Sequence, residues 1–219
     1  QWEDLGADIG EAIVHTDIHE RYFAQPVELG AYKALAIGPG LGMEEDTALA
    51  LIEQIQGCLL PVVLDADAIN ILSTHRNWLN RIPKHCILTP HLGELERLIG
   101  KCMDTYERLT KVKELAAYLQ SYIIVKGAWS TLVTPEGKCY INSTGNSGMA
   151  TGGSGDALTG IILALLSQGY TQEEACLLGM YVHGLAGDIA AEEYTEIGMT
   201  ASDLVAQLPA AWKKLKETH

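Results

Sequence analysis

The sequence predicts an α/β fold with a mostly parallel sheet, helices on both of its faces and an antiparallel hairpin at one edge. Two observations support this prediction. Four short apolar runs alternate with longer segments of helical periodicity, which is the pattern of buried parallel strands joined by helices. Two further short runs flank Pro135-Glu136-Gly137, which is typical of a hairpin. No internal repeat or low-complexity linker divides the 219 residues, so we expect one domain over 1–219.

The expected strands are short, and the chain before them is weakly patterned. The first thirty residues contain a short expected strand over 12–14 and an irregular segment over 20–29. Each later strand is an apolar run bounded by glycine, proline or polar residues. These strands are expected at 34–37, 61–64, 86–88, 122–125, 131–134 and 138–141.

Helical periodicity fills the segments between the strands and the end of the chain. Asp46 is expected to cap a helix that runs to residue 56, because aspartate accepts hydrogen bonds from the free N–H groups of a helix start. Thr200 with Asp203 resembles a capping box for the last helix. The further expected helices are 68–72, 92–99, 106–119, 154–168, 172–194 and 201–217.

Composition and charge exclude several classes of protein. Apolar residues make up 47% of the chain, so a packed globule is expected, and the formal net charge of -13 argues against a nucleic-acid partner. No apolar run approaches the roughly 20 residues of a membrane span, so no membrane contact is expected. The five cysteines contain no C-x-x-C pair, which favours reduced thiols in a cytoplasmic protein without disulfides or a zinc site.

The most informative segment is 142–156, which reads N-S-T-G-N-S-G-M-A-T-G-G-S-G-D and precedes an apolar helical run. Glycines at a helix start let the backbone approach a ligand, and the free N–H groups and helix dipole there favour a phosphate. Asp156 falls in the first turn, where a carboxylate suits a base that deprotonates a hydroxyl attacking a phosphoryl group. The alternative is a plain turn in which Asp156 only caps the helix.

Two further interpretations concern the same segment. Asn142 and Asn146 either bond phosphates or order the loop. The run Gly152-Gly153-Ser154-Gly155 lacks the G-x-S-x-G spacing of a nucleophile elbow, so a serine hydrolase is not expected.

Polar or glycine-rich clusters also follow the expected strand ends. Ligands of open α/β sheets bind outside the carboxyl ends of the strands, so we expect these clusters to converge with segment 142–156 on one crevice. The clusters are 38–42, 65–67, 89–94 and 126–130.

The first two clusters allow competing interpretations. Gly40 and Gly42 permit close approach of a ligand, whereas a tight turn is the alternative, and Met43 stands where a dinucleotide fingerprint needs its third glycine. Asp65 and Asp67 can hold Mg²⁺ through water, but helix capping by Asp67 is slightly favoured. We therefore assign no metal ligand from the sequence.

The last two clusters carry a histidine and a lysine. His91, with Glu94 three residues later, can touch a substrate, or Glu94 can simply favour the next helix start. Lys126 can meet a phosphate as a point charge. Trp129 can pack against an adenine or serve as an ordinary packing residue.

Taken together, these motifs resemble those of a known family. They are G-P-G-L-G (38–42), L-D-A-D-A-I-N (64–70), L-T-P-H-L-G-E (88–94), V-K-G-A (125–128) and G-N-S-G-M-A-T-G-G-S-G-D (145–156). Their order resembles that of the ADP- or ATP-dependent NAD(P)H-hydrate dehydratases of the ribokinase-like superfamily, over most of the chain from Leu35 onward. The element T-P-H-x-G-E separates this family from related sugar and vitamin kinases.

The resemblance implies a repair reaction in which NADH or NADPH hydrated at the nicotinamide ring is phosphorylated by ADP or ATP and then loses phosphate. It implies Asp156 as the base and as a contact of the hydrate, together with Gly40 or Gly42 and His91. Mg²⁺ is expected from the phosphoryl chemistry. The implied nucleotide-binding residues are Lys126, Gly127, Ala128, Trp129, Ser130, Asn142, Asn146, Gly153, Ser154 and Gly155, with Ser130 and Ser154 at positions where the family usually has threonine.

Family members usually carry an additional N-terminal segment with a glycine-rich strand end. Region 1–30 matches the family poorly and the chain starts at Gln1, so we expect that the additional segment was removed, is disordered or belongs to another polypeptide. The hydrate pocket of this chain alone is then expected to be incomplete. The resemblance also implies self-association, and an NAD(P)H-hydrate epimerase is a candidate partner. Two rival functions are a small-molecule hydroxyl kinase of the same superfamily and a non-catalytic nucleotide-binding fragment or subunit.

Overall fold

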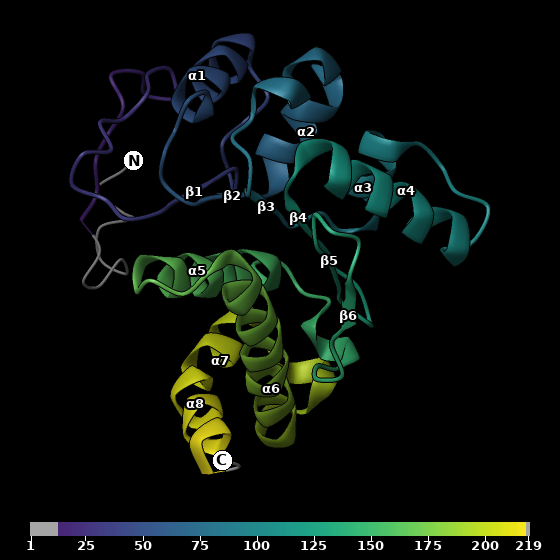
Figure 1. Ribbon diagram of the computed structural model, residues 1–219. Helices are drawn as coiled ribbons and strands as arrows, with labels where there is room; N and C mark the ends of the chain where they lie inside the picture. The colour runs from purple at the N-terminus through teal and green to yellow at the C-terminus, as the bar shows by residue number, and fades with distance from the viewer. Residues whose placement is uncertain (1–12, 218–219) are drawn as a thin grey trace.

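A computed structural model of the protein describes residues 13–217, and a six-stranded sheet lies at its centre (Figure 1). The strands follow one another across the sheet in chain order. The first four are parallel, and the last two form an antiparallel hairpin at the edge, as the sequence predicts. The strands are β1 Leu35–Ile37, β2 Val62–Leu64, β3 Ile87–Leu88, β4 Tyr122–Val125, β5 Thr131–Val133 and β6 Cys139–Ile141.

Helices cover both faces of this sheet. The first four lie on one side and the last four on the other (Figure 1). The first group is α1 Glu45–Ile55, α2 Ala66–Thr74, α3 Leu92–Ile99 and α4 Thr105–Leu119, with the 3-10 helix η1 Arg76–Arg81. The second group is α5 Ser154–Ser167, α6 Gln172–Gly198, α7 Ala201–Ala206 and α8 Leu208–Glu217, preceded by the 3-10 helix η2 Ser147–Met149.

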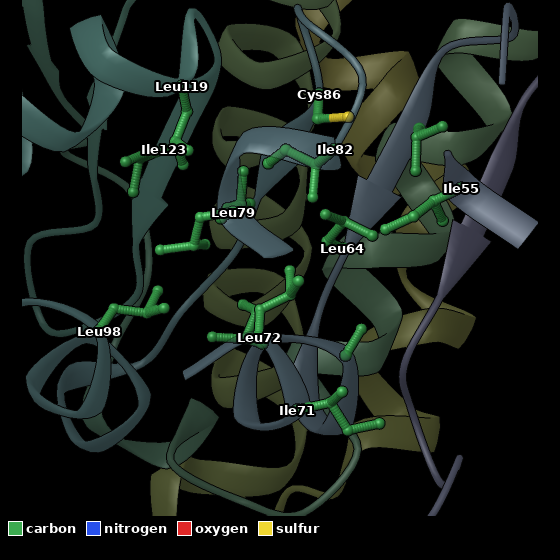
Figure 2. Packing of buried hydrophobic residues seen from close by; sticks show 14 of the residues in the cluster. Ile55, Leu64, Ile71, Leu72, Leu79, Ile82, Cys86, Leu98, Leu119 and Ile123 are labelled. Carbon is green, nitrogen blue, oxygen red and sulfur yellow. The ribbon is translucent and has the colours of Figure 1, made fainter. Parts of the chain in front are cut away.

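Successive residues of the central strands point into two different cores, because side chains alternate between the faces of a sheet. Leu64 and Leu88 belong to the core beneath α1–α4, and Figure 2 shows Leu64 there among other buried side chains, including Ile55 of α1. Val63 and Ile87 belong to the core beneath α5 and α6. Burial on both faces explains why these strands are continuous apolar runs rather than alternating ones.

The strand register brings the carboxyl ends of the parallel strands to one edge. Ile37 pairs with Leu64, and Leu64 pairs with Leu88, so the strands end level with one another. The residues that follow, among them Asp65 and Lys126, are therefore neighbours although they are far apart in sequence. Candidate ligand-binding residues of such sheets lie at this edge.

Several predicted helix boundaries differ from the structure, and α2, predicted over 68–72, is two residues longer at each end. Helix α1 is capped by Glu44 rather than Asp46, and no side chain bonds its first N–H groups. The predicted helix 201–217 is split at Gln207 into α7 and α8, because Pro209 has no N–H to continue the hydrogen-bond ladder. Helix α6 extends past the predicted end at residue 194, with a kink at Thr195, whose φ is 65°.

Other local predictions have mixed outcomes. The capping box of Thr200 and Asp203 is confirmed, with the backbone N–H of each bonded to the side chain of the other. The irregular segment 20–29 is confirmed as well. Of the predicted strand 12–14, residue 12 lies outside the described residues, and Ile13 and Val14 are exposed and form no strand. Within residues 13–217, no helix is long and apolar enough to cross a membrane.

Candidate active site

A cavity of about 570 Å³ opens beside the start of α5, at the carboxyl edge of the sheet. Its walls come from the turn between β4 and β5, the loop between β6 and α5, and the middle of α6. It is lined by His91, Lys126, Gly127, Ala128, Ser130, Asn142, Thr144, Gly145, Asn146, Ser147, Met149, Ala150, Thr151, Ser154, Gly155, Leu158, Met180, His183 and Gly184.

The glycine-rich segment ends in an uncapped helix start. Gly153 occupies the N-cap position of α5 with φ 88°, a left-handed conformation that favours glycine, and no side chain bonds the first N–H groups. The first turn of this helix therefore offers free donors and a partial positive charge to an anion. Gly155 of this turn lines the cavity, and the exposed residue Asp156 follows it.

Hydrogen bonds to α6 hold the loop between β6 and α5 in place. Asn142 Nδ2 donates to the carbonyl oxygen of Met180 at 3.1 Å. The carboxylate of Asp188 accepts from the backbone N–H of Gly145 and from Asn146 Nδ2, both at 3.0 Å. The amide groups of Asn142 and Asn146 thus order the loop, which is one of the two roles considered for them.

Close packing of the loop against the backbone of α6 completes this contact, through the backbone of Thr144 and the side chain of Met149. A Cβ built on Gly184 would lie 2.6 Å from the carbonyl carbon of Thr144, and one built on Gly187 would lie 2.7 Å from Met149 Cγ. Both glycines lie in α6 and are buried. The loop can approach the helix this closely only because neither position has a side chain.

His183 ties α6 to the start of α5. Its Nε2 lies 2.8 Å from the carbonyl oxygen of Ser154 and 3.3 Å from Ser154 Oγ. Burial lowers the pKa of the His183 imidazole to about 4, and the nearby charge of Lys126 lowers it further, against the opposing effect of the hydrogen bond to Ser154. The ring is therefore neutral near pH 7 and donates its Nε2–H to the carbonyl.

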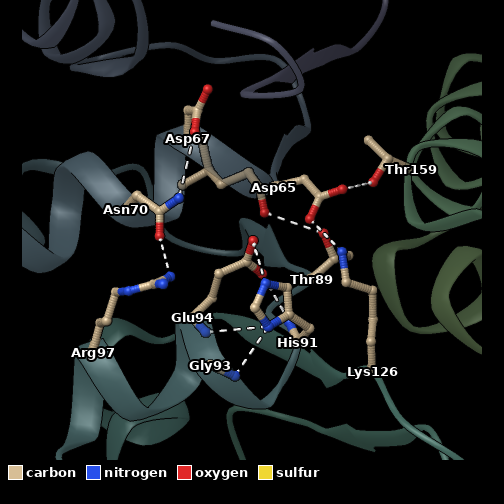
Figure 3. Close-up of polar contacts among 11 residues, drawn as sticks. Asp65, Asp67, Asn70, Thr89, His91, Gly93, Glu94, Arg97, Lys126 and Thr159 are labelled. Atoms are coloured by element: carbon tan, nitrogen blue, oxygen red, sulfur yellow. Dashed lines mark hydrogen bonds and ion pairs between the residues drawn. The ribbon is translucent and has the colours of Figure 1, made fainter. Parts of the chain in front are cut away.

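Lys126, which lines the cavity, forms a buried ion pair with Asp65, and Figure 3 shows the two side chains. Lys126 Nζ is 2.7 Å from Asp65 Oδ1, and Thr159 Oγ1 donates to Asp65 Oδ2 at 2.7 Å. Asp65 is completely buried. The three side chains come from the ends of β2 and β4 and from α5, so the contact joins the sheet to the helix that starts at the cavity.

This pair argues against the magnesium site considered for Asp65 and Asp67. The carboxylate of Asp65 is occupied by Lys126 and Thr159, while Asp67 accepts from the backbone N–H of Gly42 at 3.0 Å. No group of three or more possible metal ligands gathers anywhere in residues 13–217. The alternative of helix capping by Asp67 is also wrong, because Asp65 occupies the N-cap position of α2.

His91 stands at the edge of the cavity in a fixed orientation. Its Nδ1 accepts from the backbone N–H groups of Gly93 and Glu94, and its Nε2 lies 3.2 Å from Glu94 Oε1 (Figure 3). Glu94 Oε2 in turn accepts from the His91 backbone N–H at 2.8 Å. The pair therefore starts α3 and fixes the imidazole tautomer with Nε2 protonated, while half of the His91 side chain stays exposed.

Not every predicted site residue lines this cavity. Most of the predicted nucleotide-binding residues do, but Trp129 does not, and it is 68% exposed. Asp156 is exposed beside the cavity wall, in the first turn of α5. The other predicted residues outside the lining are Gly40, Gly42 and Gly153.

Three residues that shape the site did not stand out in the sequence. His183 and Asp188 lie within α6, and Thr159 is a single hydroxyl residue without a motif. Thr144 lies in the predicted segment 142–156, but no role was predicted for it. The run His183-Gly184-Leu185-Ala186-Gly187-Asp188 is the one available signal, because small and polar residues at this spacing share one face of a helix.

Comparison with known proteins places the chain in a family. A family model described as NAD(P)H-hydrate dehydratase matches residues 5–210. A bifunctional NAD(P)H-hydrate repair enzyme of Thermofilum pendens is 42% identical over 185 residues, which are 84% of this chain and 35% of that protein. An ADP-dependent (S)-NAD(P)H-hydrate dehydratase of Bacillus subtilis is 36% identical over 187 residues, which are 84% of this chain and 66% of that protein.

Solved structures agree with this placement. The Bacillus subtilis ADP/ATP-dependent NAD(P)H-hydrate dehydratase, co-crystallised with ATP and Mg²⁺, superposes with a TM-score of 0.73 at 35% identity, covering 87% of this chain and 67% of that one. A ribokinase-like superfamily protein of Enterococcus faecalis gives a TM-score of 0.71 at 29% identity, covering 83% of this chain and 63% of that one. The present chain thus spans about a third of the length of the bifunctional relatives it matches. It has the ribokinase-like fold and belongs to the NAD(P)H-hydrate dehydratase family.

Proposed function

We propose that this chain catalyses the nucleotide-dependent dehydration of hydrated NADH and NADPH. The supporting observation is the uncapped, glycine-lined start of α5, which offers free N–H donors beside a cavity and carries Asp156 in its first turn. Phosphoryl transfer needs anion-binding donors and a positioned base at one place. Family membership agrees with this chemistry, because relatives are described as ADP-dependent dehydratases of the same hydrate.

Two steps account for the reaction. The hydroxyl oxygen of the hydrated ring attacks the terminal phosphorus of ADP or ATP, and the carboxylate of Asp156 takes the hydroxyl proton. The bond from that phosphorus to the bridging oxygen breaks, and AMP or ADP leaves. The carbon–oxygen bond of the phosphorylated ring then breaks with release of phosphate, and the adjacent carbon loses a proton to form the double bond.

The nucleotide is proposed to occupy the cavity, whose volume of about 570 Å³ lies in the usual range of small-molecule sites. Gly155 and the first-turn amides of α5 would hold its phosphates. Asn142 and Asn146 would act through the shape of the loop, since their amide groups already have protein partners. Lys126, Gly127, Ala128, Trp129, Ser130, Gly153 and Ser154 complete the proposed nucleotide site.

Mg²⁺ was present with ATP in a related structure. Direct protein ligation does not fit the residues described here, because Asp65 and Asp67 are engaged by protein donors and no cluster of ligands gathers within 13–217. We therefore propose that any Mg²⁺ arrives on the nucleotide phosphates, and we assign no residue of this chain to it.

The hydrate is proposed to contact Gly40 or Gly42, His91 and Asp156. The glycines and His91 follow the ends of β1 and β3, and Asp156 lies in the first turn of α5. The bifunctional relatives suggest an epimerase as a partner domain or chain. Self-association is proposed from the family alone. The five cysteines are free thiols, which supports our proposal of a cytoplasmic location.

The proposed function is tested by mixing hydrated NADPH with ADP or ATP and following the return of NADPH absorbance. Replacement Asp156→Asn should lower kcat by about 10²–10⁴-fold, because the base is lost, while ADP binding persists. Asp46→Asn is a matched control, since Asp46 is also in the first turn of a helix but belongs to α1. Full activity of Asp156→Asn would contradict the role of Asp156 as the base.

Product analysis separates the rival functions. A hydroxyl kinase would accumulate a phosphorylated hydrate, whereas the dehydratase releases inorganic phosphate and NADPH. A non-catalytic nucleotide-binding subunit would bind ADP but convert nothing until a further chain is added. The chain covers only 35% and 66% of the two relatives described above, so the experiment includes this last rival.

A further inference from the structure

The buried contact of Asp65 with Lys126 and Thr159 has a role that neither the fold nor the family description assigns. Asp65 has no exposed surface, and each of its two carboxylate oxygens has one partner at 2.7 Å. Burying a carboxylate is costly unless it is paired and hydrogen-bonded. An apolar residue would fill the same space without that cost, so the buried charge calls for a reason in the function of the neighbouring site.

The ammonium of Lys126 lies at the point where the phosphates are proposed to bind. The lysine lines the cavity, and only 18% of its side chain is exposed. A Cβ built on Gly155 would be 3.0 Å from Lys126 Nζ, so the ammonium lies against the first turn of α5. Among residues 13–217, Asp65 is the single hydrogen-bond partner of this Nζ, which leaves two of its three N–H donors for a ligand.

We propose that Asp65 is a positioning residue that aims the ammonium of Lys126 at the nucleotide phosphates, and that Thr159 holds Asp65 in the required orientation. This inference rests on the proposed nucleotide site. A lysine side chain has many rotamers, and a fixed carboxylate restricts the ammonium to one position. Because Asp65 and Lys126 together are neutral, the lysine contributes directed donors rather than a free positive charge.

The chain of contacts also links the ligand to the helix that carries the base. Thr159 lies in α5, one turn beyond Asp156, and its hydroxyl donates to Asp65 at the end of β2. The ammonium at the end of β4 thereby keeps a constant position relative to the first turn of α5. Pre-organised donors of this kind cost no rearrangement when charge develops on a transferring phosphoryl group.

Titration calorimetry with ADP and with adenosine separates positioning from general damage. Asp65→Asn should weaken ADP binding by about tenfold or more, which is the usual scale of a charge-assisted hydrogen bond. It should leave adenosine binding unchanged, because adenosine has no phosphate. Thr159→Val should weaken ADP binding less, and Thr159→Ser should restore it by returning the hydroxyl.

Two further variants keep the inference falsifiable if Asp65→Asn fails to fold. In a Lys126→Met background both charges are removed together, and Asp65→Asn should then add no further loss of ADP affinity, because Asp65 acts only through Lys126. Thr47→Val is the matched control for Thr159→Val, since Thr47 is also fully buried and its hydroxyl has no partner among the described residues. It should bind ADP as the unaltered protein does.

The outcomes separate this inference from the proposed function. Absence of ADP binding by the unaltered protein would overturn the proposed nucleotide site and this assignment with it. Unchanged ADP binding in Asp65→Asn and in Thr159→Val would overturn the positioning role alone. So would a further loss of ADP affinity when Asp65→Asn is added to Lys126→Met, because Asp65 would then act other than through Lys126. An equal loss of ADP and adenosine affinity would also overturn it, because that pattern indicates a collapsed pocket.

Discussion

The imidazole Nε2 of His183 lies 2.8 Å from the carbonyl oxygen of Ser154, so the middle of α6 is hydrogen-bonded to the first residue of α5. The first turn of α5 is where we propose that the phosphates bind. The His183 side chain thus bonds to Ser154 of this turn, and the Lys126 ammonium lies against Gly155 of the same turn. Two elements distant in sequence therefore hold the most important turn of the site.

His183 should make the stability of the protein depend on pH. Its pKa is about 4 in the folded state, against an ordinary value of 6.5, because burial disfavours the charged ring. Between these values the unfolded chain binds more protons, so the free energy of unfolding should rise from pH 4 to pH 6.5 and level off above. The pKa difference of His183 should raise the free energy of unfolding by about 3 kcal/mol at most over this pH range. Urea unfolding across this range measures it.

The matched variants for this prediction are His183→Gln and His15→Gln. The first should flatten the pH dependence between 4 and 6.5, since glutamine does not titrate. The second should leave it intact, because His15 is exposed. An unchanged pH profile in His183→Gln would show that another group is responsible.

Gly184→Ala should disrupt the loop that forms one wall of the cavity. The added Cβ would overlap the backbone of Thr144, so the loop must move away from α6. We expect weaker ADP binding and a lower free energy of unfolding, although alanine is the better helix former. Gly160→Ala in α5 is the control: its Cβ meets nothing within 4 Å, so it should stabilise the protein by about 0.5–1 kcal/mol.

Asp188→Asn should loosen the loop without unfolding the protein. Both carboxylate oxygens of Asp188 accept a hydrogen bond, whereas asparagine has only one side-chain oxygen. The NH₂ group of the new side chain would face the N–H donor of Gly145 or of Asn146, so at least one of the two hydrogen bonds is lost. Hydrogen exchange should become faster in residues 142–149, and the KM for the nucleotide should rise more than kcat falls. Glu192→Gln, an exposed change on the same helix, should alter neither quantity.

The cysteines should divide into two reactivity classes under alkylation of the native protein. Burial raises the pKa of the Cys86 thiol to about 12 and raises the pKa of the Cys176 thiol as well. Because the thiolate is the reactive form, these two should be modified only after unfolding. Cys58, Cys102 and Cys139 are half-buried and should react first. Mass spectrometry of peptides at successive times checks the order.

The strands and most helices were predictable because their signals are local. Val62–Leu64 and Tyr122–Val125 are apolar runs between breakers, and hydrophobic periodicity identifies α3 and α4. Helix ends were less predictable. The break between α7 and α8 depends on Pro209, which has no N–H to bond to a carbonyl of the preceding turn. The apolar periodicity continues through this position, so it does not show the break.

Alternating apolar runs and helical segments predicted the fold class, and the glycine-rich motif before Asp156 with the other motifs in their order indicated the family. Each of these signals lies in a short stretch of sequence, so it can be recognised without the tertiary structure. The tertiary structure alone decided that Lys126 pairs with Asp65, 61 residues away, and that Thr159 reaches Asp65 across 94 residues. It also decided that the Asp188 carboxylate bonds to the loop at Gly145 rather than facing solvent. Such contacts arise when the sheet brings distant strand ends together, and no local pattern records which side chains then meet.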